Sequence, residues 1–115
     1  MTGEEFRSIA LSFPETEEKM HMKHPDFRVR GKIFATLWYP DESWGMVKLS
    51  PAGQETFVHA DPVAFVPVKG AWGLQGCTSV KLSKAKKTMV RSALAEAWEY
   101  ASAKASAKKA PAKKK

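Results

Sequence analysis

Apolar positions recur with helical spacing at the start of the chain. They are Phe6, Ile9, Ala10 and Phe13. Because they lie three or four residues apart and stop before Pro14, they predict a short amphipathic helix. Thr2 and Glu5 precede this stripe with the spacing of a capping box, in which each side chain accepts a hydrogen bond from the other residue's backbone N–H.

From Thr16 to Leu49 the pattern changes to short runs typical of β-strands, separated by turn-forming residues. The four runs are Glu17–Met22, Phe27–Arg30, Lys32–Tyr39 and Trp44–Leu49. In the second run Phe27 and Val29 alternate with Arg28 and Arg30, which indicates one packed and one solvent-exposed face. The third run is apolar on both faces and is expected to lie centrally. Together the runs predict an antiparallel meander.

The second half of the chain adds two helices and one strand. Ser50 and Pro51 form an N-cap and N1 pair that opens a short helix through about His59. A glycine-rich loop, Gly70–Gly76, then leads into a strand over Cys77–Leu82. We predict that Ser83 caps a long final helix. Its apolar stripe consists of Val90, Leu94, Ala97, Trp98 and Ala101.

This order of elements predicts an α+β fold. We expect an antiparallel sheet of about five strands, with the N-terminal, middle and C-terminal helices packed mainly on one face. The residues expected to be mostly buried are Ile33, Phe34, Leu37, Val47, Leu49, Val80, Leu82, Leu94 and Trp98.

Almost all of the net charge of +7 lies at the end of the chain. Residues 102–115 hold six lysines and no acid, whereas residues 1–101 hold 13 Lys or Arg against 12 Asp or Glu, a net charge of +1. Such a segment has too little apolar surface to offset its ordering entropy. We therefore predict a folded domain over residues 1–101 and a disordered basic tail over 102–115. Polyanions attract such a tail through counterion release.

Composition places the chain among globular intracellular proteins. Apolar residues make up 43% of it, and four tryptophans can anchor a core. The single Cys77 cannot form an internal disulfide, and neither a signal-peptide pattern nor a run of about 18 apolar residues is present. We expect a soluble cytoplasmic protein, with association with the nucleoid as one option.

Residues that could carry chemistry have plainer explanations. His21, His24 and Asp26 invite a metal site, but zinc needs three or four converging ligands and a solvent-facing strand end is an ordinary place for histidines. Cys77 lacks a visible activating base and is expected in the core. The carboxylates near the first helix, among them Glu4 and Glu5, are interpreted as a solvated face. We expect no catalytic residue, no metal and no cofactor.

Two positions retain a binding hypothesis. The glycine-rich loop precedes a strand, so it cannot form a phosphate cradle at a helix N-terminus. Its Trp72 either closes over the core or stacks on a base or another planar ligand. At the predicted start of the final helix, Ser83, Lys84 and Lys87 could hold a phosphate with the free N–H groups, unless these lysines are ordinary surface charges.

Several segments resemble the MmcQ/YjbR family of small bacterial proteins with a frataxin-like (CyaY-like) α+β fold. They are, in order, Phe27–Leu37, Met46–Pro51, Phe65–Val68, Ala71–Gly73, Gly76, Thr78, Val80–Leu82 and Ala97–Trp98. The resemblance covers about residues 4 to 101 and excludes the tail. It implies the fold, no catalytic motif and a DNA-binding role, the last by structural analogy.

These observations favour a non-enzymatic DNA-binding protein that is largely independent of sequence, with RNA not excluded. The nucleic-acid-binding residues that we predict are Arg28, Arg30, Lys32, Lys48, Lys69, Trp72, Lys81, Lys84, Lys87, Arg91, Lys104, Lys108, Lys109, Lys113, Lys114 and Lys115. The alternative is an interaction module that binds a protein or a small anion at the Trp72 loop. An enzyme or metal-handling protein is the third possibility.

Overall fold

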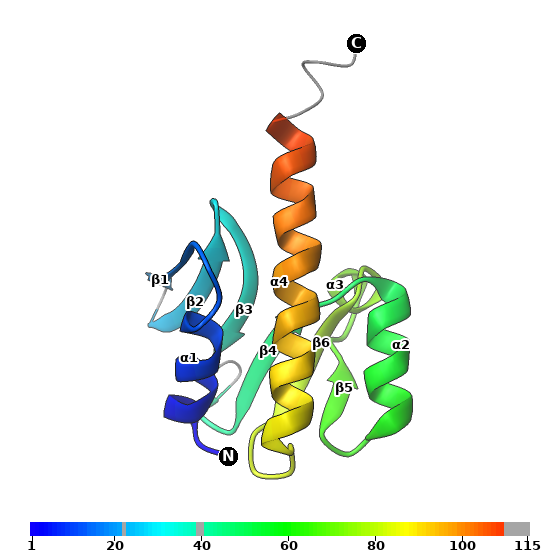
Figure 1. Cartoon of the computed structure of the whole chain (residues 1–115). Helices are drawn as coiled ribbons and strands as arrows, with labels where there is room; N and C mark the ends of the chain where they lie inside the picture. The colour runs from blue at the N-terminus through cyan, green and yellow to red at the C-terminus, as the bar shows by residue number, and fades with distance from the viewer. Residues whose placement is uncertain (22, 39–40, 110–115) are drawn as a thin grey trace.

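The computed structural model describes residues 1–21, 23–38 and 41–109, with side chains for all of these except His21 and residues 106–109 (Figure 1). The described residues form four helices and six strands. They are α1 (Gly3–Leu11), β1 (Thr16–His21), β2 (His24–Val29), β3 (Lys32–Leu37), β4 (Trp44–Lys48), α2 (Pro51–Ala60), β5 (Phe65–Pro67), α3 (Ala71–Leu74), β6 (Cys77–Lys81) and α4 (Lys87–Lys109). The strands form one antiparallel sheet in the order β1-β2-β3-β4-β6-β5. The predicted α+β class is confirmed.

The long helices α1, α2 and α4 lie on one side of the sheet, and α4 runs across its middle (Figure 1). Two predicted helix starts are confirmed. Thr2 N donates to Glu5 Oε1 at 2.8 Å and Glu5 N donates to Thr2 Oγ1 at 3.1 Å, which completes the capping box of α1. Ser50 Oγ accepts from Gly53 N at 3.0 Å at the start of α2.

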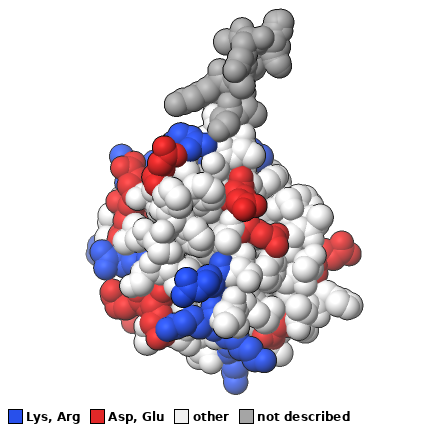
Figure 2. All heavy atoms as spheres, in the orientation of Figure 1, with Lys and Arg blue, Asp and Glu red and all other residues white. Residues whose placement is uncertain are grey.

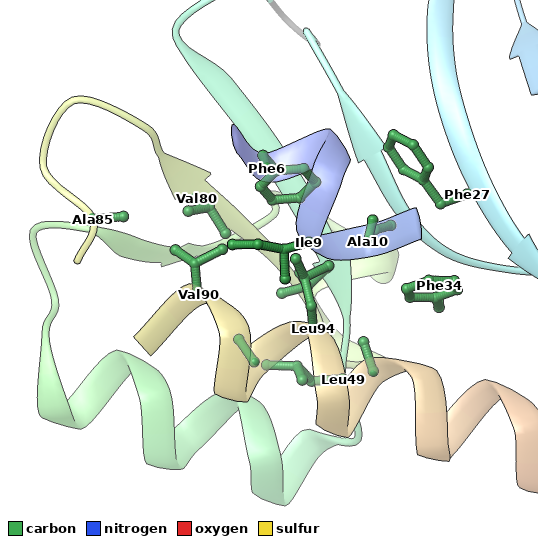
Figure 3. Packing of buried hydrophobic residues seen from close by; sticks show 14 of the residues in the cluster. Phe6, Ile9, Ala10, Phe27, Phe34, Leu49, Val80, Ala85, Val90 and Leu94 are labelled. Atoms are coloured by element: carbon green, nitrogen blue, oxygen red, sulfur yellow. The ribbon is translucent and has the colours of Figure 1, made fainter. Parts of the chain in front are cut away.

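The core fills the space between the sheet and these helices (Figure 3). Phe6 of α1 lies there beside Phe27 of β2, with their ring centroids 6.3 Å apart. The register between β2 and β3 skips Phe34, because Phe27 pairs with Ala35 and Arg28 with Ile33. This bulge lets both Phe34 and Ala35 be buried, whereas a regular strand would bury only one of two neighbours.

The same bulge explains one of two departures from the predicted core. Seven of the nine residues that we predicted as buried are buried, and Ile33 and Trp98 are half-buried. Ile33 pairs with Arg28, on the side of the sheet away from the helices. Trp98 packs at the margin of the core, where its indole N–H donates to the carbonyl of Pro14 at 3.0 Å.

Two small elements between α2 and β6 were not predicted. The segment Phe65–Pro67 pairs with β6 as the edge strand β5, so that β6 lies between β4 and β5. Within the glycine-rich loop, Ala71–Leu74 forms the single helical turn α3. Three residues that include a proline carry too little pattern to be recognised as a strand from sequence.

Both ends of α4 differ from the prediction. The helix begins at Lys87, while Ser83 and Lys84 lie in a turn in which the N–H groups of Lys84 and Ala85 donate to the carbonyl of Lys81. At the other end, the helix continues past the predicted domain boundary at Ala101 as far as Lys109. Ala105 is buried there, so the beginning of the predicted tail packs against the domain.

None of the helices in the described part of the chain is long and apolar enough to cross a membrane.

Candidate nucleic-acid interface

The side of the sheet opposite α1, α2 and α4, which we call the open face, carries most of the predicted site residues that belong to strands. One row of side chains crosses it on all six strands. From edge to edge, the row consists of Lys19, Asp26, Thr36, Met46, Ser79 and Val66. Its centre is therefore uncharged and of moderate size.

Strand β4 shows how the two faces are divided. Gly45 and Val47 are buried toward the helices, whereas Trp44, Met46 and Lys48 are half-buried on the open face. Gly45 has no room for a side chain, since a Cβ there would lie 2.9 Å from the ring of Phe6. This close approach of α1 fixes the alternation and holds Trp44 and Lys48 on the open face.

Two tryptophan–lysine pairs lie at opposite ends of β4. The Lys81 ammonium lies 5.0 Å from the centroid of the Trp44 ring, and the Lys48 ammonium lies 5.6 Å from that of Trp72. Trp72 is 60% exposed, so it does not close over the core. Neither ammonium forms an ion pair with a carboxylate of the described residues. The charge of Lys81 nevertheless acts on Asp41, whose pKa is lowered mainly by hydrogen bonds from Ser43 and to a smaller extent by Lys81.

Arg28 is paired with a buried acid on the same strand. Its guanidinium donates to both carboxylate oxygens of Asp26, at 2.8 and 3.1 Å, and Asp26 is only 3% exposed. The hydrogen bond to Asp26 raises the pKa of Arg28 further above its ordinary value. Because removing Arg28 would leave a buried carboxylate uncompensated, we assign Arg28 to the stability of the sheet.

Arg30 and Lys32 flank the turn between β2 and β3. Arg30 pairs with Glu15 and donates to the carbonyl and the hydroxyl of Ser102, at 3.0 and 2.8 Å. The turn is thereby attached to α4 beyond the predicted domain boundary. Lys32 is half-buried at the first position of β3. At this turn, Arg30 therefore contacts Glu15 and Ser102 of the same molecule.

The predicted phosphate site at Ser83 does not form as proposed. Ser83 and Lys84 precede α4 in a turn and do not open the helix. Lys87 does lie in its first turn, but its ammonium pairs with Glu5 at 3.3 Å. The hydrogen bond from the backbone at Thr2, followed by the contact with Lys87, lowers the pKa of Glu5.

Acids also surround Arg91. A hollow of about 370 Å³ between α1 and α4 is lined by Glu4, Glu5, Lys87 and Arg91 among others. On the helix-covered side of the molecule, basic and acidic groups lie close to one another (Figure 2). At the start of α4, Lys87 is therefore paired with an acid, and Arg91 shares a hollow with two carboxylates.

A second group of predicted cations lies toward the other end of α4. There α4 extends past the sheet, on the side where β4 ends and β6 begins, and its Ser102 contacts the turn between β2 and β3 (Figure 1). We call this region, with Lys48, Trp72 and Lys104, the distal end. Lys69 is exposed two residues before α3, and Lys104 lies 4.6 Å from the Tyr100 ring. The remaining predicted tail residues are Lys108 and Lys109, whose backbone is helical, and Lys113, Lys114 and Lys115, which lie outside the described residues.

The thiol of Cys77 lies within electrostatic range of both Lys48 and Lys104. The thiol is 3% exposed, and burial raises its pKa, while the charges of Lys48 and Lys104 act in the opposite direction. Both ammonium groups are thus close enough to influence one thiol. The raised pKa disfavours the thiolate, so Cys77 is a core residue and a poor nucleophile.

The described residues contain no group of three His, Cys, Asp or Glu side chains placed to hold a metal ion. The candidate site consists of the exposed ring of Trp72, the half-buried ring of Trp44 and two ammonium groups. Such groups bind planar and anionic ligands. Sequence reasoning had identified Trp72 and Lys48 separately but had missed Trp44, whose alternation with Gly45 was the available signal.

No curated protein shows a significant match to the chain. A family match is found, however, over residues 11–100, which include the whole sheet and most of α4. The matching family is described as YjbR, and the chain belongs to it.

Proposed function

We propose that the protein is a non-enzymatic nucleic-acid-binding protein. DNA is its main ligand, and binding is largely independent of sequence. The observation that carries this proposal is the Lys48 ammonium 5.6 Å from the centroid of the exposed Trp72 ring, at the end of the molecule where α4 presents its lysines. An aromatic ring beside a cation offers a base a stacking surface and a phosphate a charge.

Independence from sequence follows from the shape of the interface. Base readout in the major groove requires a helix or a two-stranded ribbon that projects into it. On the open face, the described side chains lie on a sheet, and Arg28 is occupied by Asp26. The contacts that remain are stacking and phosphate contacts, which carry little sequence information.

The charge distribution requires a contribution from the end of the chain. Residues 1–101 have a net charge of +1, so they attract a polyanion weakly, whereas residues 102–115 add six lysines. In the proposed role, the open face supplies contacts with bases and the C-terminal lysines supply charge. The proposal places the protein in the bacterial cytoplasm, in contact with the nucleoid.

A second candidate function is protein binding at the Trp72 loop. Leu74 follows Trp72 in α3 and is 83% exposed, and Val66 on the adjoining edge strand is 37% exposed. Exposed apolar side chains of this size mark docking surfaces in many proteins. In this alternative, the side chains of Leu74 and Trp72 both contribute to affinity. Nucleic-acid binding by stacking requires only the ring of Trp72, so substitution of Leu74 distinguishes the two functions.

The deciding experiment neutralises lysines without shortening the chain. Truncation after Ala101 would also remove the buried Ala105 and the Ser102 partner of Arg30, so a loss of binding would be ambiguous. The tail-neutral variant replaces six lysines with glutamine: Lys104, Lys108, Lys109, Lys113, Lys114 and Lys115. The matched control replaces the three lysines at the start of α4: Lys84, Lys86 and Lys87.

Affinity for a duplex is measured by fluorescence anisotropy between about 50 and 200 mM salt. Each phosphate contact on duplex DNA contributes about −0.9 to the slope of log K against log salt. The slope of the tail-neutral variant should therefore be shallower by up to about 5, while the control should change by less than about 1. Unchanged affinity and slope in the tail-neutral variant would contradict the role of the tail. If the full chain bound neither duplex nor single-stranded nucleic acid at low salt, that result would contradict the proposed function.

A further inference from the structure

The open face has the geometry of a stacking surface for unpaired bases. Trp44 and Lys48 lie four residues apart on β4, which places the two tryptophan–lysine pairs about 13 Å from each other along the strand. Thr36, Met46 and Ser79 lie between them and carry no charge. A strand of nucleic acid can follow such a surface with a cation at each end.

Duplex DNA does not fit this arrangement well. Its bases stack on one another, so their faces are inaccessible to Trp44 and Trp72 without base flipping or intercalation. A single strand exposes the faces of its bases, and their stacking on aromatic side chains is tolerant of sequence. The ammonium groups of Lys48 and Lys81 are then next to the phosphates that join the stacked nucleotides.

We propose that the preferred ligand is single-stranded nucleic acid, bound across the open face with bases stacked on Trp72 and Trp44. This inference rests on the proposed function and narrows it to unpaired strands. The charges of the tail cannot produce such a preference, because counterion release per phosphate is larger for a duplex than for a single strand. A preference for single strands therefore reports on the open face and not on the tail.

The test compares three probes with the full-length protein: oligo(dT) and oligo(rU) of about 12 nucleotides, and a DNA duplex of the same length. We expect oligo(dT) to bind at least about tenfold more tightly than the duplex, with quenching of tryptophan fluorescence. Tighter binding of oligo(rU) than of oligo(dT) would support the same surface and identify RNA as the source of the strand.

Single substitutions then assign the effect to the rings. Trp72→Ala should weaken oligo(dT) binding by about 5- to 150-fold and leave duplex affinity unchanged, and Trp44→Ala should act in the same direction. Trp72→Phe should retain most of the affinity, because a phenyl ring still stacks. Retained binding in this variant would show that the loss in Trp72→Ala comes from the missing ring and not from misfolding. The matched control is Leu74→Ala, on the same turn of helix but two residues after Trp72, a spacing at which helical side chains do not face each other.

The outcomes separate this inference from the proposed function. Equal affinity for duplex and oligo(dT), with Trp72→Ala without effect on either, would overturn the single-strand inference while leaving salt-dependent nucleic-acid binding intact. Equal losses in Leu74→Ala and Trp72→Ala would also overturn it and favour an apolar docking surface. If the full chain bound none of the three probes at low salt, both proposals would fail together.

Discussion

The two faces of the sheet are built from the same strands but differ in what their side chains contact. On the helix-covered face, Gly45 and Val47 of β4 are buried beneath α1 and α4. On the open face, Trp44 and Lys48 of the same strand contact cations or rings and remain partly accessible. Under the proposed function, most of the stability depends on the covered face and the ligand contacts lie on the open face. Substitutions can therefore separate the two properties.

The largest effect is expected from Phe34, which is fully buried on the covered face with its ring centroid 6.5 Å from that of Phe13. Phe34→Ala should lower the free energy of unfolding by about 3–5 kcal/mol, because it removes a large side chain and leaves a cavity. Urea denaturation measures the loss. Met46→Ala on the open face is the control and should cost less than about 1 kcal/mol. Similar losses in the two variants would contradict the division between the faces.

Trp98 should have a smaller effect because it lies at the margin of the covered face. Its ring stacks on that of Phe13 at 6.3 Å, and its N–H donates to Pro14. Trp98→Ala should lower the free energy of unfolding by about 2–3 kcal/mol, below the range for fully buried aromatic residues. Trp98→Phe keeps the stacking and should lose only the hydrogen bond, about 1 kcal/mol. A loss below about 1 kcal/mol in Trp98→Ala would show that the ring is not an anchor.

Gly45 tests the spacing between α1 and the sheet. A methyl group there would lie 2.9 Å from the ring of Phe6, which is itself fully buried. Gly45→Ala should therefore lower the free energy of unfolding by about 1–3 kcal/mol through overpacking. The control is Ser79→Ala on the open face, expected within about 0.5 kcal/mol of the unchanged protein. A neutral or stabilising Gly45→Ala would show that α1 can move away from β4.

The smallest effect concerns Cys77, which lies opposite Lys48 in register but is buried. Burial raises the pKa of its thiol, so the folded state favours the neutral form. This contribution to stability is present below the ordinary thiol pKa of about 8.5 and is lost as the pH rises from there toward the folded-state pKa. Urea midpoints from pH 7 upward should fall more steeply for the unchanged protein than for Cys77→Ala. Parallel curves, or rapid alkylation of the folded protein, would contradict the burial of this thiol.

Local signals made much of the fold predictable. Thr2 with Glu5, and Ser50 with Pro51, specify helix starts through contacts within a few residues, and both were confirmed. Ser83 had the same appearance but does not cap α4, because Leu82 and Ala85 are buried on either side of the turn that contains Ser83 and Lys84. Tertiary packing outweighed the local preference there.

The extension of α4 had a signal that we interpreted in the wrong way. Alanine and lysine are strong helix formers, and Ala97, Ala101 and Ala105 continue one helical stripe. The candidate site was less predictable, because its pairs join residues distant in sequence. Lys48 meets Trp72 and Lys81 meets Trp44 only through the register of β4 with β6 and the position of α3. Which cations are balanced by acids, as Lys87 is by Glu5, also depends on packing.

The continuation of α4 to Lys109 has a calorimetric consequence. A segment that folds only on binding shows a large unfavourable entropy, since each residue that becomes ordered contributes about 1–2 kcal/mol to the cost. Residues 102–109 are already helical, and the contact of Ser102 with Arg30 holds this part of the helix against the domain. Titration calorimetry with a polyanion should therefore give an entropy dominated by released counterions, with little sign of coupled folding from this stretch of the chain.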